Sequence, residues 1–277
     1  MLVLLMHGIA SGASGTKEDP YTTISEVRNL PIPEAGKGLH FVLDAQILHI
    51  GLARSGLFLA QDHMGIYAAV LREIDKGLPF QQGSVVRIRG RTNRGSYLPI
   101  LEIEHLEVLA NEPLPEALPL TYDNIFHPEL DCSWVSLEGF VLGSSLNSSY
   151  LTLQVETFGS LIDVILENRP DSDEKARHLI HRHIKLRGIA ASQANEKRQL
   201  TARNIRVQDF SDIDLTVSSG QIPLVGIDKL LTPQWSSVGK VRIRGVVTNV
   251  QNQRFYIRGI GGSLLAKVRG TVEAGVG

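Results

Sequence analysis

Apolar and polar residues alternate in short runs along most of the chain, which predicts β-strands that each bury one face. One run with a small residue near its centre occurs three times, around Ala45, Gly139 and Gly245, at separations of 94 and 106 residues. Glycine within a strand is typical of a bulge or a sharp bend. The pattern therefore predicts a repeated β unit whose first strand bends.

A second pattern, a strand that reaches a glycine and continues as another apolar strand, follows each copy of the first. Its glycines are Gly65, Gly159 and Gly262, at separations of 94 and 103 residues. A third pattern occurs only twice, at 85–90 and 184–188. The given sequence stops at Gly277 before a third copy, so we expect the last unit to lack its final strands.

Five strands, a bend in the first and a helix between the third and fourth describe an OB-type barrel. In the second unit we expect this helix at 171–180, with Pro170 before it and Asp171 as its N-cap. In the first unit, residues 68–75 either form its counterpart or extend the third strand. The predicted fold is all-β with minor α, as tandem OB-like five-stranded barrels, two complete and a truncated third. A generic antiparallel sandwich is the alternative.

Proline clusters separate the units and short apolar leaders precede them. The prolines lie at 113–119 and at Pro223, and the leaders, spaced for one or two helical turns, at 22–30, 120–125 and 225–231. The predicted organisation is a partial signal or disordered start at 1–19, OB-like module 1 at 20–115, module 2 at 116–220 and partial module 3 at 221–277.

The composition narrows the possible functions. Lys and Arg total 28 and Asp and Glu total 29, so the basic excess typical of proteins that coat duplexes or membranes is missing. The single cysteine, Cys132, excludes an internal disulfide framework and a zinc site built from several cysteines. The apolar start of the chain followed by small residues indicates either the end of an export signal or a disordered start of a cytoplasmic protein.

Parts of the sequence resemble a known signalling region. The runs 118–123, 131–141, 57–67 and 195–200, with the opening of the third unit at 239–248, are similar to the N-terminal sensor-like region that precedes many bacterial sensor histidine kinases. The resemblance covers roughly residues 20–268. It implies a periplasmic or extracytoplasmic β region followed by a membrane helix and kinase domains, both absent from this sequence, so no catalytic residue is carried over.

A cluster of arginines is one candidate binding site. Arg87, Arg89, Arg91 and Arg94 lie within eight residues, and Tyr97 follows them. OB barrels bind single strands through a basic groove with stacking aromatic rings. The alternation, however, places Arg87 and Arg89 on the solvent face of a strand, and aromatic residues make up only 6% of the chain. A solvated face is the simpler interpretation, and nucleic acid is an unlikely partner on this pattern.

Trp134 and Trp235 are candidates for stacking on sugars, since OB folds also bind oligosaccharides. Trp134 has the opposite strand parity to Val135 and Leu137, so packing against a neighbouring module is the main alternative.

Metal and enzyme signatures are weak. His178, His181 and His183 lie close in sequence, but no carboxylate or thiol completes a zinc spacing. Cys132 has no neighbouring base in sequence, and the glycine, serine and histidine motifs of common enzyme classes are missing. We expect no metal, no cofactor and no enzymatic activity.

Together, these patterns favour a non-catalytic extracytoplasmic sensing or interaction region of a bacterial signal-transduction protein, with an unknown small molecule, glycan or protein as partner. The alternatives are an OB-fold protein that binds single-stranded nucleic acid in the cytoplasm, and a structural spacer.

Overall fold

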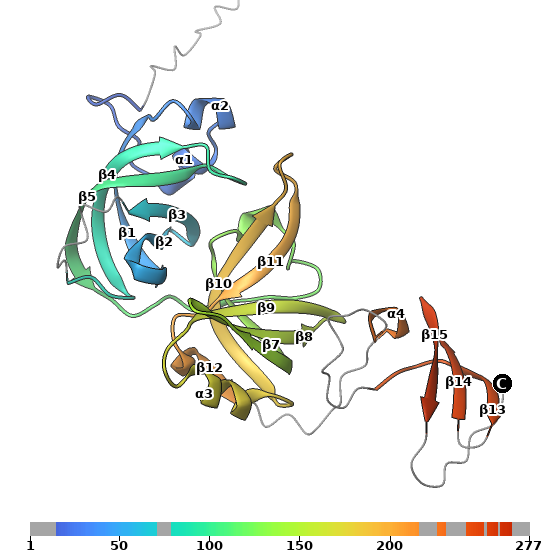
Figure 1. The fold of residues 1–277 in the computed structure, drawn as a ribbon. Coiled ribbons are helices and arrows are strands. Elements are labelled where there is room, and N and C mark those ends of the chain that lie inside the picture. Colours follow the sequence, from blue (N-terminus) through green and yellow to red (C-terminus); the bar gives the residue numbers. More distant parts are fainter. Residues whose placement is uncertain are drawn as a thin grey trace, which may run out of the picture. The chain divides into compact units, whose positions relative to one another are not determined.

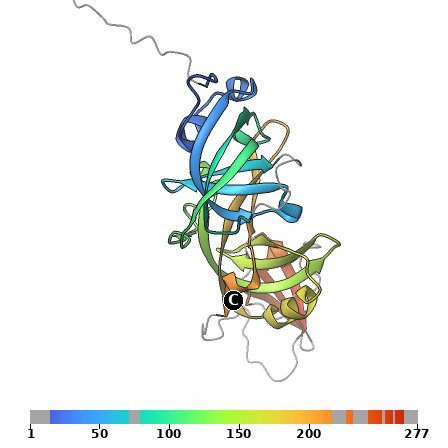
Figure 2. The same ribbon diagram turned by 90° about the vertical axis from the view of Figure 1, so that its left-hand side faces the viewer.

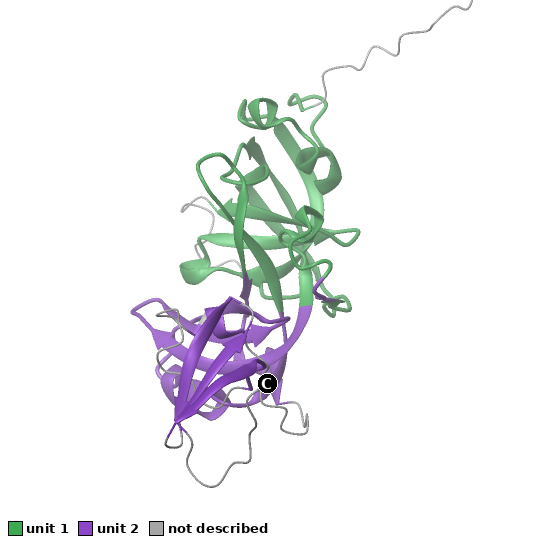
Figure 3. Cartoon of the chain, turned by 90° about the vertical axis from the view of Figure 1, so that its right-hand side faces the viewer, with its two compact units in different colours: residues 1–118, 123–135, 188–203 green, residues 119–122, 136–187, 204–277 purple. Residues whose placement is uncertain are grey.

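The computed structural model describes residues 15–70, 79–215, 226–230, 242–251, 254–259 and 261–267. The chain divides into two compact units (Figure 3). The first contains Met1–Leu118, Asp123–Val135 and Gly188–Arg203, and the second contains Pro119–Tyr122, Ser136–Arg187 and Asn204–Gly277.

The first module is a closed five-stranded barrel with the order β1-β2-β3-β5-β4 (Figure 1). Its strands are β1 (His40–Ile50), β2 (Gly56–Gln61), β3 (Met64–Val70), β4 (Ser84–Asn93) and β5 (Ile100–Asn111). All neighbours are antiparallel except β3 and β5, which are parallel. This is the Greek-key arrangement of an OB barrel, as the sequence predicts.

A short helix, α1 (Ile24–Arg28), lies against the first barrel (Figure 2). Its Ile24 and Val27 are fully buried and join the apolar cluster of the barrel strands. Thr23 and Glu26 form a capping box. The Thr23 side chain accepts a hydrogen bond from the backbone amide of Glu26, and the Glu26 carboxylate accepts one from the backbone amide of Thr23. A second short helix, α2 (Ile32–Ala35), follows α1 before the first strand. The 3-10 helix η1 (Leu52–Arg54) joins β1 to β2.

The second module repeats the same strand order. Its strands run β7-β8-β9-β11-β10, and a pairing between β10 and β7 closes the ring. β9 and β11 are parallel, as β3 and β5 are in the first barrel. The bounds are β7 (Trp134–Leu146), β8 (Tyr150–Thr157), β9 (Ser160–Glu167), β10 (His183–Ala194) and β11 (Leu200–Arg206). Short flanking elements are β6 (Leu118–Pro119), η2 (Pro128–Leu130), η3 (Phe210–Asp212) and β12 (Ile213–Leu215).

The helix expected between the third and fourth strands of module 2 is present as α3 (Ser172–Leu179). Asp171 is the N-cap residue of this helix, as expected, but its side chain makes no capping hydrogen bond to the first turn. Its carboxylate instead pairs with Lys175 Nζ at 2.7 Å, one turn along the helix.

The third module contributes a three-stranded antiparallel sheet in the order β13-β14-β15. Its strands are β13 (Val246–Gln251), β14 (Arg254–Gly259) and β15 (Gly262–Lys267), and α4 (Ile227–Leu230) precedes them. Phe255 is buried, and Ile227 of α4 is 1% exposed.

The first repeat marker is confirmed in all three modules. The pairing registers place Ala45, Gly139 and Gly245 opposite the last residue of the following strand, and each first strand has a bulge that begins two residues later. A Cβ on Gly139 would lie 2.6 Å from the Glu156 carbonyl oxygen, and one on Gly245 would lie 2.7 Å from the equivalent oxygen of Arg258. Close approach of the neighbouring strand therefore explains the small residue.

The second repeat marker is wrong at the level of single residues. The pairs that close the strand 2–3 hairpins are Gln61–Met64, Thr157–Ser160 and Gly259–Gly262. Gly65 therefore lies within β3, while Gly159 lies in the turn at φ +70° and Gly262 opens β15. The three glycines serve three different purposes, and their similar spacing reflects hairpins of the same length.

The leaders at 22–30 and 225–231 contain α1 and α4, whereas 120–125 forms turns without a helix. In the first unit, residues 68–70 extend the third strand, and 71–75 lie outside the described residues. The start of the chain at 1–14, Pro223 and Trp235 also lie outside them. Within the described ranges, no helix has the length and hydropathy to span a membrane.

Candidate nucleic-acid interface

OB folds bind oligonucleotides and oligosaccharides on the outer face of strands 2 and 3. The three hairpin-closing pairs put this face of every module in one common register. Three residues before the turn, the outward positions are Phe58, Gln154 and Tyr256. Opposite them on strand 3 are Tyr67, Asp163 and Leu265. The three copies of this face can therefore be compared position by position.

In module 1 this face is covered by other residues of the first compact unit. Phe58 is 6% exposed and lies edge-on to Tyr67, with ring centroids 5.1 Å apart. These rings belong to an apolar cluster with Cys132, Trp134 and Ile189, all within the first compact unit. The aromatic pair that would suit base stacking is therefore used for packing.

Trp134 is 5% exposed within this cluster, so its ring does not offer a free stacking surface. The backbone at Cys132 also lies directly against the backbone of β3, since a Cβ on Gly65 would lie 2.0 Å from the Cys132 carbonyl oxygen. Only glycine at position 65 allows the segment that starts the second barrel to lie against β3.

In module 2 the same face is acidic. The outward residues of β8 and β9 include the carboxylates Glu156, Asp163 and Glu167. Arg206 on β11 lies next to this face, with its guanidinium carbon 6.0 Å from the Tyr150 ring centroid. Three carboxylates against one guanidinium repel a phosphate backbone.

In module 3 the face is basic, aromatic and exposed. Arg254, Tyr256 and Arg258 occupy alternate positions of β14 and point to solvent, and Tyr256 is 39% exposed. In the register of β14 and β15, Lys267 lies opposite Arg254, and Leu265 lies opposite Tyr256. None of these three cations forms an ion pair with another residue of the described chain.

The charge of this region is a signal that our sequence analysis missed. Residues 241–277 hold six Lys or Arg and a single acidic residue, Glu273, while the preceding 240 residues hold 22 basic and 28 acidic residues. The near-zero total charge hides this segregation, which charge counted by module would have revealed.

The arginine cluster predicted from sequence is largely neutralised. Arg87 donates two hydrogen bonds to the Asp44 carboxylate, at 2.7 and 2.8 Å. This contact lowers the pKa of Asp44 and raises the pKa of Arg87. Arg91 pairs with Glu104 at 3.0 Å, and Arg89 is exposed on β4. The cluster therefore forms a strand face of mixed charge rather than a basic groove.

Arg94 and Tyr97 lie in the loop between β4 and β5, and this loop is tied down through its backbone. Arg198, at the tip of the β10–β11 hairpin, donates hydrogen bonds to the carbonyl oxygens of Arg94, Gly95 and Tyr97 at 2.7, 2.9 and 2.8 Å. The loop that contributes ligand contacts in OB folds is thus fixed from inside the first unit.

The clustered histidines contact neighbouring rings and backbone, and the single cysteine is buried. Phe140 lies 6.5 Å from the His181 ring centroid and 5.0 Å from that of His183. His178 contacts the Glu174 carbonyl oxygen through Nδ1 at 2.8 Å. No group of three metal-ligating side chains occurs in the described ranges. Burial, followed by the nearby charge of Asp131, raises the pKa of the Cys132 thiol well above its usual value, which keeps it protonated.

Comparison with known proteins finds no matching family model and no matching curated protein. The resemblance to sensor regions of histidine kinases therefore stays a prediction. Among solved structures, the chain is similar to a murine DNA-binding protein bound to double-stranded DNA, at 11% identity and a TM-score of 0.31, over 60% of this chain and 90% of that one. It is also similar to the tetrameric p202 HIN2 domain, at 12% identity and a TM-score of 0.30, over 65% and 95%. A third similarity is to asparaginyl-tRNA synthetase from Pyrococcus horikoshii, at 15% identity and a TM-score of 0.29, over 44% and 28%.

Proposed function

We propose that this chain is an OB-fold binding protein that holds single-stranded nucleic acid on the outer face of β14 and β15. The observation that carries the proposal is the row of Arg254, Tyr256 and Arg258 on one exposed strand face, with Lys267 beside it. This is the face that OB folds use for oligonucleotides.

The chemistry of the row suits a single strand. Alternate residues of a strand stand about 7 Å apart on one face, so each arginine flanks the tyrosine ring at that spacing. An exposed aromatic ring stacks on any base and contributes about 1–3 kcal/mol per base, while flanking cations contact the phosphates. Leu265, which is 51% exposed, extends the apolar surface beside the ring.

The same comparison explains why the other two modules are not proposed as sites. The equivalent face of module 1 is filled by Trp134 and its neighbours, and that of module 2 is lined by carboxylates. The proposal thus differs from the preference drawn from sequence, which favoured an extracytoplasmic sensing region. It takes up the cytoplasmic alternative and places the contact on residues outside the original cluster.

Fluorescence anisotropy with a labelled 20-nucleotide single strand tests the proposal. If Arg254, Arg258 and Lys267 each contact a phosphate, the logarithm of the binding constant falls with the logarithm of salt concentration with a slope of about −2. Tyr256→Ala should weaken binding about 5- to 100-fold at constant salt, and Arg254→Ala with Arg258→Ala should reduce the slope to about −0.7.

Matched controls come from the same chain. Tyr122 is 73% exposed outside the proposed face, so Tyr122→Ala should leave the affinity unchanged. Arg89 is exposed on β4, and Arg89→Ala should leave the salt slope unchanged. Absence of binding at 50 mM salt, or equal losses in Tyr122→Ala and Tyr256→Ala, would contradict the proposal.

A further inference from the structure

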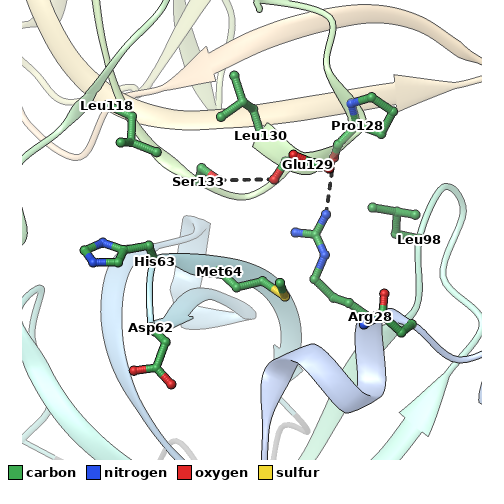
Figure 4. Close-up of a pocket in the computed structure, with 11 residues that line it drawn as sticks. Arg28, Asp62, His63, Met64, Leu98, Leu118, Pro128, Glu129, Leu130 and Ser133 are labelled. Carbon is green, nitrogen blue, oxygen red and sulfur yellow. Dashed lines mark hydrogen bonds between the residues drawn. The ribbon is translucent and has the colours of Figure 1, made fainter.

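A cavity of about 440 Å³ lies within the first compact unit (Figure 4), and its lining includes no residue of the proposed nucleic-acid face. The end of α1, the β2–β3 turn, the β4–β5 loop and the η2 segment surround it. Its size is within the range of small-molecule sites. Nothing in the proposed function uses it.

Arg28 is the one Lys or Arg residue among the described residues that line the cavity. Its guanidinium donates hydrogen bonds to three backbone carbonyl oxygens, those of Gly65 at 2.5 Å, Asp131 at 2.7 Å and Pro128 at 3.2 Å. These bonds fix the group in place. Because a guanidinium has five N–H donors, two remain without a partner in the described chain, and they and the charge are available to an anionic group.

The rest of the lining has two characters. Met64 and Leu98 present apolar surface next to the Arg28 side chain (Figure 4), and Leu130 adds apolar surface elsewhere in the lining. Asp62 and Glu129, two exposed acidic residues, complete the charged part of the lining. The cavity therefore combines a fixed cation, an apolar wall and an acidic rim.

We propose that this cavity binds a small zwitterion, an α-amino acid with an apolar side chain. The ligand carboxylate pairs with Arg28, its ammonium group with Glu129, and its side chain packs on Met64, Leu98 and Leu130. An inorganic anion would leave the apolar wall unused and meet the two rim carboxylates. A ligand without charge would desolvate the Arg28 guanidinium with no compensating bond.

Calorimetry on the full chain with L-leucine, L-methionine and L-phenylalanine as probes tests the proposal. We expect at least one of them to bind, and its analogues that lack either the amino group or the carboxylate to bind at least tenfold more weakly. Inorganic phosphate should not compete. Equal binding of the amine-free analogue, or no binding of any probe, would overturn the assignment.

Variants separate ligand contact from folding. Leu98→Trp fills the cavity while leaving the Arg28 residue unchanged, and should abolish binding. Glu129→Gln should weaken it at least fivefold, whereas Glu116→Gln, exposed and outside the lining, should not. Thermal unfolding of each variant shows that the fold persists. Unchanged affinity in Leu98→Trp would overturn the proposal, whatever the outcome of the single-strand titration, because the two sites share no residue.

Discussion

Phe58 and Tyr256 occupy the same register position of their modules, three residues before the strand 2–3 turn, yet Phe58 is 6% exposed and Tyr256 is 39% exposed. The difference arises from what lies over each ring. Phe58 is covered by Cys132, Trp134 and Ile189, whereas the neighbours of Tyr256 on its face are the exposed Arg254 and Arg258. Repetition of one fold has thus produced one face that is used for packing and one face that stays exposed.

The packing of residues 132–134 against β3 in module 1 leads to a prediction for Gly65. Gly65→Ala should lower the free energy of unfolding by about 1–3 kcal/mol, because the added methyl group would lie 2.0 Å from the Cys132 carbonyl oxygen and force backbone apart. Chemical denaturation measures the loss, and a red shift of Trp134 emission in a Trp235→Phe background reports loosening of the cluster.

Gly36→Ala is the matched control for that substitution. A Cβ at position 36 would meet its nearest atoms at 3.5 Å, which is ordinary contact, and φ there is −73°. Its unfolding free energy should change by less than about 0.5 kcal/mol. If the two alanine variants behave alike, residue 132 does not lie against β3.

Arg198 makes a prediction about the β4–β5 loop. Arg198→Ala removes hydrogen bonds to the carbonyl oxygens of Arg94, Gly95 and Tyr97 and should cost about 1–2 kcal/mol. Amide hydrogen exchange of residues 94–99 should become faster, since the loop then opens locally. Lys197→Ala, an exposed neighbour in the same turn, should leave that exchange unchanged. Equal exchange in both variants would show that the loop does not depend on Arg198.

The sequence was most informative where local patterns carry the structure. The small residues at Ala45, Gly139 and Gly245 predicted the bent first strand, because close approach of the next strand leaves room for little more than a hydrogen or a methyl group. The similar spacing of Gly65, Gly159 and Gly262 suggested that they are equivalent positions, which is wrong. A glycine in a turn and a glycine required by close packing cannot be distinguished in the sequence.

The candidate site was harder to predict because exposure depends on what covers a strand. Arg87 belongs to a dense cluster in the sequence, but its partner Asp44 lies 43 positions earlier and comes opposite it only because β1 and β4 pair as neighbouring strands. Arg254 and Arg258 are fewer and further apart, yet no carboxylate of the described chain pairs with them. Only the strand register and the ion pairs together distinguish a neutral face from a basic one.

The capping box of α1 predicts a dependence of stability on pH. The hydrogen bond from the Thr22 amide, followed by those from the Thr23 hydroxyl and amide, lowers the pKa of Glu26. A carboxyl whose pKa is lower in the folded state stabilises the fold above its unfolded pKa of about 4.3, and this contribution is lost as pH falls through the folded value.

Glu26→Gln should therefore destabilise the protein by about 0.5–1 kcal/mol at pH 7, and the difference from wild type should shrink below about pH 4. Denaturant unfolding at a series of pH values measures it. Glu18→Gln, which removes an exposed carboxylate outside the box, should show no such trend. A Glu26→Gln effect that does not vary with pH would mean that the carboxylate charge has no part in the cap.

Transplanting the basic face onto the second barrel tests the proposed function by gain rather than loss. Thr152, Gln154 and Glu156 stand at the positions of Arg254, Tyr256 and Arg258, and Asp163 stands at the position of Leu265. The combined variant Thr152→Arg, Gln154→Tyr, Glu156→Arg and Asp163→Leu should therefore recreate the row on a closed barrel.

In a background with Arg254→Ala, Tyr256→Ala and Arg258→Ala, this transplant should restore single-strand binding with a salt slope of about −1.4, the value for two phosphate contacts. Fluorescence anisotropy measures both affinity and slope. Substituting only Glu156→Gln and Asp163→Asn removes the acidic charge without adding the row, and should restore nothing. If this neutral variant binds as well as the transplant, then charge removal alone governs binding and the arginine–tyrosine row is not the recognition element.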